Sequence, residues 1–254
     1  MRARSGRFML KLIRIPRSTA IQGTARHVTR RSGRVGRKGS EPFSCPDQAS
    51  SATISVMTGF AVKPLCQSRW PDFAALVERH NGVWGGCWCM AFHPEGVGRG
   101  KTAAQNRTEK ECRAREGSAH AALVYDGGTC VGWCQFGSPD ELPRIKRQRA
   151  YRDGLTLLPN WRITCFFVDK AYRGQGVAVA ALKGALQEIA RLGGGTVESY
   201  PEEVAGRSVS ASFLHNGSIS MFEAQGFERL RPIGKDHWVV AKVARANRKQ
   251  AVSE

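Results

Sequence analysis

The stretch Ala171-Tyr-Arg-Gly-Gln-Gly-Val-Ala178 carries the clearest structural signal in this chain. It follows Trp161–Val168, a run rich in β-branched and aromatic residues, which predicts a central strand buried on both faces. After it, apolar residues recur at helical spacing until Gly193-Gly-Gly195, at Ala178, Ala181, Leu182, Ala185, Leu186 and Ile189. The sequence therefore predicts a strand, a glycine turn and an amphipathic helix in succession.

A strand, glycine turn and helix in this order can hold a phosphate group. The first turn of a helix leaves backbone N–H groups unpaired, and the helix dipole adds roughly half a positive charge there. Gly174 and Gly176 remove side chains that would keep an anion away, and Arg173 adds a positive charge. The stretch lacks the Gly-Lys-Ser/Thr ending of a P-loop and the Gly-x-Gly-x-x-Gly pattern of a dinucleotide-binding fold. It predicts a diphosphate site, with a plain turn and a solvated arginine as the alternative.

The rest of the pattern alternates helices and strands, without an internal repeat. We expect a helix over 68–80, a polar helix over 101–116, a hairpin of 119–125 with 129–136, a surface loop over 137–158 and a strand over 196–200. Asp126-Gly-Gly128 supplies the turn of the hairpin. A chain of 254 residues with this pattern predicts one domain plus appendages.

The N-terminal part differs from the rest in charge and composition. Residues 1–56 carry 12 Lys and Arg against two acids, Glu41 and Asp47, out of a formal net charge of +18 for the whole chain. We expect a basic, disordered extension over 1–56, with an over-extended start and a true start near Met57 as the favoured reason. An organellar transit peptide and a nucleic-acid-binding arm are the alternatives. We also expect a basic tail over 244–254.

The eight cysteines do not form a disulfide framework of the secreted kind, and no secretory signal precedes the domain. Cys87-Trp-Cys89 is a tight pair, but no second pair completes a zinc framework, so we expect no metal. Two half-buried thiols are the favoured interpretation of this pair, and a role at the acceptor site or in redox chemistry is the alternative. No apolar run approaches the roughly eighteen residues of a membrane helix, so we expect no membrane partner and a cytoplasmic location.

Arg173-x-x-Gly176-x-Ala178 resembles the signature of the GNAT family of N-acetyltransferases, and Asn216-Gly-Ser-Ile-Ser-Met-Phe-Glu-Ala-Gln-Gly-Phe227 resembles its late helix. The resemblance covers residues 57–243. It implies an α/β (α+β) fold: a mixed, mostly antiparallel sheet flanked by helices, with a central strand, phosphate loop and helix.

The resemblance also implies the residues that bind acetyl-CoA. Phe167 and Val168 would offer backbone groups to the pantetheine amides. The diphosphate would be held by Arg173, Gly174, Gln175, Gly176, Val177 and Ala178. Asn216 would hydrogen-bond the pantetheine arm, and a helix N-cap is the alternative role for it.

The implied reaction is acetyl transfer to an amine by direct attack within a ternary complex. Glu198 is the candidate base, because the strand that carries it lines the acceptor side in the family. Tyr200 and Ser220 are available as the acid, and departure of the thiolate without an acid is the alternative. A solvated strand-end carboxylate is the alternative for Glu198. Many members carry a tyrosine acid where this chain has Phe222, so the proton for the leaving thiolate is unassigned.

The acceptor is expected to be a small-molecule, peptide or protein amine, and the protein a monomer or homodimer. The loops 84–100, 137–158 and 201–213 are expected to shape the acceptor pocket. The basic residues of 137–158 hint at an acidic acceptor, with solvent-exposed charge as the favoured alternative. Two other functions stay open: a CoA-binding regulatory module without turnover, and, less favoured, a nucleic-acid-associated protein acting through its basic arm.

Overall fold

A computed structural model describes residues 59–210 and 213–247 of the chain. The predicted extension over 1–56 and most of the predicted tail lie outside the described residues. Among the helices that the structure describes, none combines the length and apolar character that spanning a membrane takes.

The described residues form seven strands, five α-helices and three short 3-10 helices. In chain order these are β1 (Ala61–Pro64), η1 (Gln67–Arg69), α1 (Trp70–Arg79), α2 (Ala103–Arg115), β2 (His120–Asp126), β3 (Thr129–Gly137), α3 (Gln148–Asp153), β4 (Trp161–Val168), η2 (Lys170–Tyr172), α4 (Val177–Arg191), β5 (Gly195–Ser199), η3 (Leu214–Asn216), α5 (Ile219–Glu223), β6 (Glu228–Pro232) and β7 (Trp238–Ala244).

The seven described strands form one mixed sheet in the order β1-β2-β3-β4-β5-β7-β6. Within it, β4 and β5 are paired parallel, and the other neighbouring strands are antiparallel. The predicted fold class, a mostly antiparallel mixed sheet flanked by helices, is confirmed. A right-handed crossover through a helix is the usual way to join parallel neighbours, and α4 makes the connection between β4 and β5 here.

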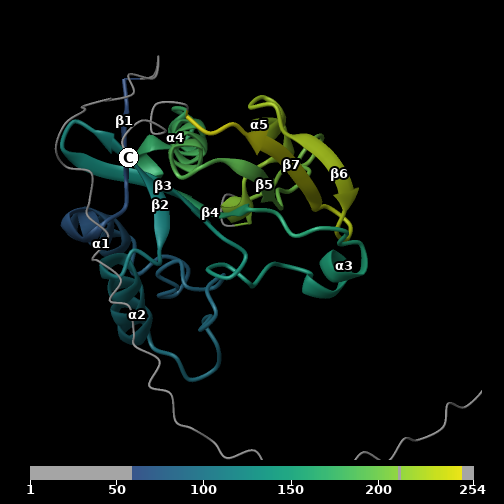
Figure 1. The fold of residues 1–254 in the computed structure, drawn as a ribbon. Coiled ribbons are helices and arrows are strands. Elements are labelled where there is room, and N and C mark those ends of the chain that lie inside the picture. The colour runs from purple at the N-terminus through teal and green to yellow at the C-terminus, as the bar shows by residue number, and fades with distance from the viewer. Residues whose placement is uncertain (1–58, 211–212, 248–254) are drawn as a thin grey trace, which may run out of the picture. The chain divides into compact units, whose positions relative to one another are not determined.

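Helices cover both faces of the sheet (Figure 1). On one face, α1 packs Phe73, Leu76 and Val77 into a buried cluster with Trp133 of β3 and Phe167 of β4. On the other face, the apolar stripe of α4 packs into a second cluster, with residues such as Ala181, Leu182 and Ile189 against Phe136 and Ile163. The strand β4 contributes to both clusters, as its predicted double burial requires.

The region predicted as a loop over 137–158 contains the short helix α3, which is a correction to the sequence interpretation. Tyr151 of α3 is buried and packs with Tyr200, Ile233 and Val239 in a third, smaller cluster. Leu142 and Ile145 of the same segment are also buried, so these apolar side chains and Tyr151 order a stretch that is otherwise polar and basic. Strands β1 and β6 were also not predicted, because β1 has only four residues and β6 is largely exposed. Strand β7 was not predicted either, although it has seven residues and several of them are buried.

A β-bulge in β4 interrupts its pairing with β3. Gln135 lies opposite Cys165 and Phe136 lies opposite Ile163, so Thr164 is an extra residue without a partner in β3. Pairing of β4 with β5 ends at Ile163, the residue just before the bulge. Since a bulge bends its strand and increases the local twist, the bulge at Thr164 accounts for the separation of β4 from β5 beyond this point.

A buried polar network holds the bulge from the α1 and α2 side of the sheet. The Nζ of Lys110 donates to His93 Nε2 at 2.9 Å and to Gln135 Oε1 at 3.1 Å. The Nε2 of Gln135 in turn donates to Thr164 Oγ1 at 3.3 Å. His93 and Lys110 are both completely buried. The network therefore connects the segment after α1, helix α2 and strand β3 to the bulge.

The geometry of the network assigns the tautomer of His93. Its Nδ1 donates to the backbone carbonyl of Glu141 at 3.1 Å, so Nε2 carries the lone pair that Lys110 meets. Burial, followed by the charges of Lys110 and Arg113, lowers the pKa of His93. Burial also lowers the pKa of Lys110. Neutral His93 is therefore the form that the fold requires.

We predict that His93 makes the fold sensitive to mild acid. Because the pKa of His93 is lower in the folded than in the unfolded chain, the unfolded chain binds the extra proton first, and stability is lost as pH falls below about 6.5. Between pH 7.5 and 5.5 the wild type should lose about 1.4 kcal/mol more unfolding free energy than His93→Gln, which keeps an acceptor but does not titrate. Urea denaturation at both pH values measures this, and equal losses in the two proteins would contradict it.

Candidate active site

The candidate site begins where β4 and β5 part. Beyond Ile163, the carbonyl groups on this edge of β4 are no longer paired with β5. Side chains replace the missing strand: Ser199 Oγ donates to the Ile163 carbonyl at 2.9 Å, and Asn216 Nδ2 donates to the Thr164 carbonyl at 2.7 Å. We call the gap that opens between β4 and β5 beyond Ile163 the fork. Since buried carbonyl groups need donors, these two contacts stabilise the fork.

Further along β4, the backbone of alternate residues faces the open side. Asp169 donates its N–H to Val131 of β3, and the carbonyl of Phe167 points toward Gly132 of β3. Because backbone direction alternates along a strand, the N–H and C=O groups of Phe166 and Val168 point away from β3 and into the fork. A ligand lying along β4 could therefore pair with these groups as a strand would.

A cavity of about 380 Å³ lies along this edge of β4. One wall is β4 itself, with Phe166, Phe167 and Val168. The facing wall comes from the segment around α5, with Leu214, Gly217, Ser218 and Met221. Trp84, from the loop between α1 and α2, and Tyr172 also line it. The remaining lining residues belong to the glycine turn and the start of α4: Arg173, Gly174, Gly176, Val177, Ala178 and Val179.

The glycine turn forms the positive end of the cavity. Gly174 and Gly176 have φ angles of 76° and 85°, which other residues rarely adopt, so glycine is required at both positions. Gly176 is the N-cap of the 15-residue helix α4, and it has no side chain to accept from the N–H groups of the first turn. Those N–H groups, the helix dipole and the exposed Arg173 together favour an anion at this end.

The cavity brings together most of the cofactor residues that the sequence predicted. Phe167, Val168, Arg173, Gly174, Gly176, Val177 and Ala178 all line it. Gln175 is not in the lining, and its Nε2 donates to the Ala171 carbonyl at 2.8 Å, so it supports the shape of the turn instead. The ring of Phe167 faces the cavity, whereas the backbone groups open to the fork are those of Phe166 and Val168.

Asn216 lies at the fork and does not cap a helix. Its alternative role as the N-cap of the late helix is wrong, because α5 begins at Ile219 and its N-cap is Ser218, whose hydroxyl accepts from the Met221 N–H. Asn216 is buried, and its Oδ1 has no hydrogen-bond partner among the described residues. A buried acceptor of this kind, next to the cavity wall, is suited to an amide N–H of a ligand.

Glu198 and Tyr200 lie in a buried polar cluster with Tyr151 and Arg162. Glu198 Oε2 accepts from the hydroxyl of Tyr151 at 2.8 Å and from that of Tyr200 at 3.3 Å. Arg162 donates to the Tyr151 hydroxyl at 3.3 Å, and its Nε has no partner among the described residues. Burial raises the pKa of Tyr200 well above its usual range, so Tyr200 keeps its proton. Neither Glu198 nor Tyr200 lines the cavity described above.

The polar cluster nevertheless faces the side of the sheet that carries α1 and α2. Val197 packs in the cluster of apolar residues around α4. Because side chains alternate along a strand, Glu198 projects to the opposite face, where the hydroxyl of Tyr151 in α3 donates to it. The loop between α1 and α2 lies on this same face, so Glu198 and that loop share the side opposite to α4.

Phe222 is a core residue in this structure. Its ring makes edge contacts with Phe166 at 5.9 Å and with Phe227 at 5.0 Å between ring centroids, and the side chain is completely buried. Phenylalanine has no proton to donate, and the aromatic packing shows what it contributes instead: it fixes α5 against β4.

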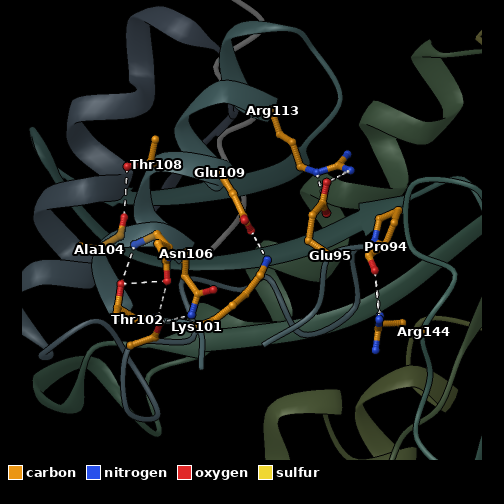
Figure 2. A network of polar contacts seen from close by, with 12 residues as sticks. Pro94, Glu95, Lys101, Thr102, Ala104, Asn106, Thr108, Glu109, Arg113 and Arg144 are labelled. Atoms are coloured by element: carbon orange, nitrogen blue, oxygen red, sulfur yellow. Dashed lines mark hydrogen bonds and ion pairs between the residues drawn. The ribbon is translucent and has the colours of Figure 1, made fainter. Parts of the chain in front are cut away.

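The α1–α2 loop (residues 80–102) is fixed to its surroundings by polar contacts. These join Glu95 to Arg113, Lys101 to Glu109, Asn106 Nδ2 to the Gly86 carbonyl, and Arg144 to the Pro94 carbonyl, most of them visible in Figure 2. Arg144 was one of the basic residues that hinted at an acidic acceptor. Here its guanidinium holds the loop, which supports a structural role for that charge.

Cys87 and Cys89 lie within this loop as free thiols, the first partly buried and the second buried. Burial raises the pKa of Cys87, which makes it a poor nucleophile at neutral pH. In the part of the chain that the structure describes, no group of three or more His, Cys, Asp and Glu side chains is arranged to hold a metal ion.

Several lining residues were not among the predicted cofactor residues, namely Trp84, Phe166, Tyr172, Val179, Leu214, Gly217, Ser218 and Met221. Strand alternation from Val168 could have found Phe166. Trp84 was placed near the acceptor, and only the fold could show that its ring reaches the cavity. The residues around α5 approach β4 because the fork leaves room for them. No local sequence pattern predicts this approach.

Comparisons with known proteins agree with this geometry. A family model described as the acetyltransferase (GNAT) family matches residues 88–227. A search of curated proteins found no match.

Solved structures were also matched, at low similarity. One is an acetyltransferase from Corynebacterium glutamicum described as histone acetyltransferase HPA2 and related acetyltransferase (17% identity, 75% of this chain and 99% of that chain covered, TM-score 0.44). Another is yncA from Salmonella typhimurium, solved with its cofactor acetyl-CoA (15%, 77% and 99%, TM-score 0.43). At these identities and TM-scores the similarities carry no argument about substrate. The match of the family model over more than half of the sequence places this chain in the acetyltransferase (GNAT) family.

Proposed function

We propose that this protein transfers the acetyl group of acetyl-CoA to an amine by direct attack within a ternary complex. One observation carries the proposal: the cavity at the fork has backbone groups of β4 along one wall and the free N–H groups of α4, with Arg173, at one end. The diphosphate would bind at α4, and the pantetheine amides would pair with Phe166 and Val168. The Oδ1 of Asn216 is a suitable acceptor for a further pantetheine N–H.

The reaction needs a neutral amine nitrogen, an electrophilic carbonyl and a route for one proton. The nitrogen forms a bond to the thioester carbon, and a free N–H of β4 would stabilise the negative charge that develops on the oxygen. The carbon–sulfur bond then breaks, the sulfur leaves with the electron pair, and the proton lost by nitrogen ends on the thiolate. Most of the rate in such a complex comes from holding the two reactants together.

Glu198 is our candidate for the group that takes the proton from the amine. It is buried on the face of the sheet that carries the α1–α2 loop, and two tyrosine hydroxyls orient it. Tyr200 keeps its proton and would orient the carboxylate or return a proton. A water chain would have to connect Glu198 to the cavity, since Glu198 does not line it.

A CoA-binding module without turnover is a second candidate, and Phe222 is the observation that favours it. The packing of this ring against Phe166 and Phe227 leaves no proton donor at the position where many family members have one. Release of CoA thiol in the presence of an amine panel separates the two candidates: binding of acetyl-CoA without thiol release for any amine would favour the module.

We predict that Arg173→Glu combined with Gly176→Asp abolishes acetyl-CoA binding. The change places two negative charges where the diphosphate would lie and removes the residue that tolerates the φ angle of 85°. Arg173→Ala alone should weaken binding by about 10- to 100-fold, because a charge-assisted hydrogen bond contributes about 1.5–3 kcal/mol. Isothermal titration calorimetry measures both.

The matched control is Arg149→Glu, which makes the same charge change at an exposed position of α3. It should bind acetyl-CoA like the wild type. Circular dichroism must show that the double variant is folded. Unchanged affinity in a folded double variant would contradict the cofactor site.

For the base, we predict that Glu198→Gln lowers kcat by about 10²- to 10⁴-fold while the Kd of acetyl-CoA stays within about twofold. Glutamine keeps the shape and accepts from both tyrosines but cannot take a proton at neutral pH. Glu188→Gln, at a carboxylate that pairs with Arg191 near the end of α4, is the control and should keep its activity. Full activity of Glu198→Gln would show that the carboxylate only holds Tyr151 and Tyr200 in place.

A further inference from the structure

Trp84 presents an aromatic surface at the end of the cavity away from α4. Its side chain lines the cavity and is 40% exposed, whereas Trp88 and Phe92 of the same loop are 4% and 7% exposed. The loop therefore buries its other large aromatic side chains and leaves one indole facing the space where a ligand would lie.

The backbone around Trp84 is strained in a way that fixes this indole. Val83 and Trp84 have φ angles of 53° and 42°, and a positive φ at a β-branched residue is a true outlier. Such conformations are unfavourable and persist only where their surroundings enforce them.

The enforcing contacts are backbone hydrogen bonds and one close approach. The Val83 carbonyl accepts from the N–H groups of Gly86 and Cys87 at 3.1 and 2.9 Å. A Cβ atom on Gly86 would lie 2.3 Å from the Cβ of Ala103, so only glycine lets the loop approach α2 this closely. Asn106 then holds the Gly86 carbonyl. The position of Trp84 is therefore set by the loop, before any ligand arrives.

Other rings surround Trp84. The ring of Phe167 lies 5.9 Å from it in an edge arrangement, and the ring of His215 lies 5.5 Å away. Phe92 contacts His215 at 6.2 Å between centroids. Trp84 and Phe167 line the cavity, and we define them as its aromatic end. His215 packs against Trp84, and Phe92 packs against His215.

The charges of the lining restrict what this end can accept. Among the described lining residues, Arg173 is the one charged side chain, and it belongs to the phosphate end. No lining residue of the described chain is a carboxylate, so a second ammonium group on an acceptor would have no countercharge. An acidic acceptor would likewise find no lysine or arginine at the aromatic end among the described lining residues.

We propose that the acceptor is a monoamine whose amino group is carried on an aromatic or similarly flat apolar group, which packs against Trp84. This inference rests on the proposed acetyl transfer and names its substrate class. A ring stacked on, or edge-on to, the indole is stabilised beyond its buried area, and an ammonium group gains further attraction from the indole face. In the described lining, a polyamine would find no carboxylate for its second ammonium group, and an acidic peptide would find no lysine or arginine at the aromatic end.

Binding is the first test, because it does not depend on turnover. With the full chain saturated with CoA, calorimetric titration should show at least tenfold tighter binding of 2-phenylethylamine than of ethanolamine or spermidine. Trp84→Ala should bring the three affinities to within about threefold of one another, and Trp84→Phe should keep the preference. Tighter binding of ethanolamine or spermidine, or a preference that survives Trp84→Ala, would overturn the inference.

Turnover of the same amines then separates this inference from the proposed function. The ratio of kcat/KM for 2-phenylethylamine to that for ethanolamine is compared between wild type and variants, so that any effect of Trp84 on acetyl-CoA cancels. Selective binding without thiol release would overturn the transfer and support the amine site. Thiol release with no preference for 2-phenylethylamine would support the transfer and overturn the amine site.

Discussion

The separation of β4 from β5 is the constraint on which the rest of the site depends. Parallel strands that stayed paired along their length would leave no room for a ligand and no unpaired backbone groups on β4. The bulge at Thr164 bends β4 just beyond its last pair with β5. Ser199 and Asn216 then supply the donors that the lost pairing would have supplied, so the fork remains open without leaving those two carbonyls unsatisfied.

The same bulge connects the two faces of the sheet. The hydroxyl of Thr164 belongs to the buried network of Gln135, Lys110 and His93. This network links the α1–α2 loop and α2 to β4. On the other face, α4 starts at the glycine turn and packs its apolar stripe on the sheet. One strand irregularity thus aligns a phosphate end, made by α4, with an aromatic end, made by the α1–α2 loop. A ligand spanning both ends would place its reactive group near the fork.

Local patterns predicted the central part of the fold because burial and periodicity act there together. The predicted strand over Trp161–Val168 matches β4 at both ends, and the glycine turn and α4 follow as expected. The short strand β1, the exposed strand β6 and the helix α3 depend on partners distant in the sequence, so no local signal could reveal them. For α3 the decisive contact is Tyr151 with Tyr200, Ile233 and Val239.

For the site, glycine conformation and helix start were readable from the sequence, and seven of the nine predicted cofactor residues line the cavity. Gln175 turned out to support the turn, and Phe166 was missed although strand alternation from Val168 would have indicated it. The bulge itself left no trace in the sequence, since Thr164 continues an ordinary strand pattern. Roles for Glu198 and Tyr200 stay predictions.

Amide hydrogen exchange of the full chain, with and without saturating acetyl-CoA, tests the central claim most directly. If the cofactor takes the place of a strand along β4 and binds its diphosphate at α4, exchange should slow at Phe166 and Val168 and at the first-turn amides of α4, Val177 to Val179. Amides in the middle of α2 should change much less. Protection elsewhere, with no change at the fork and at the start of α4, would contradict the account.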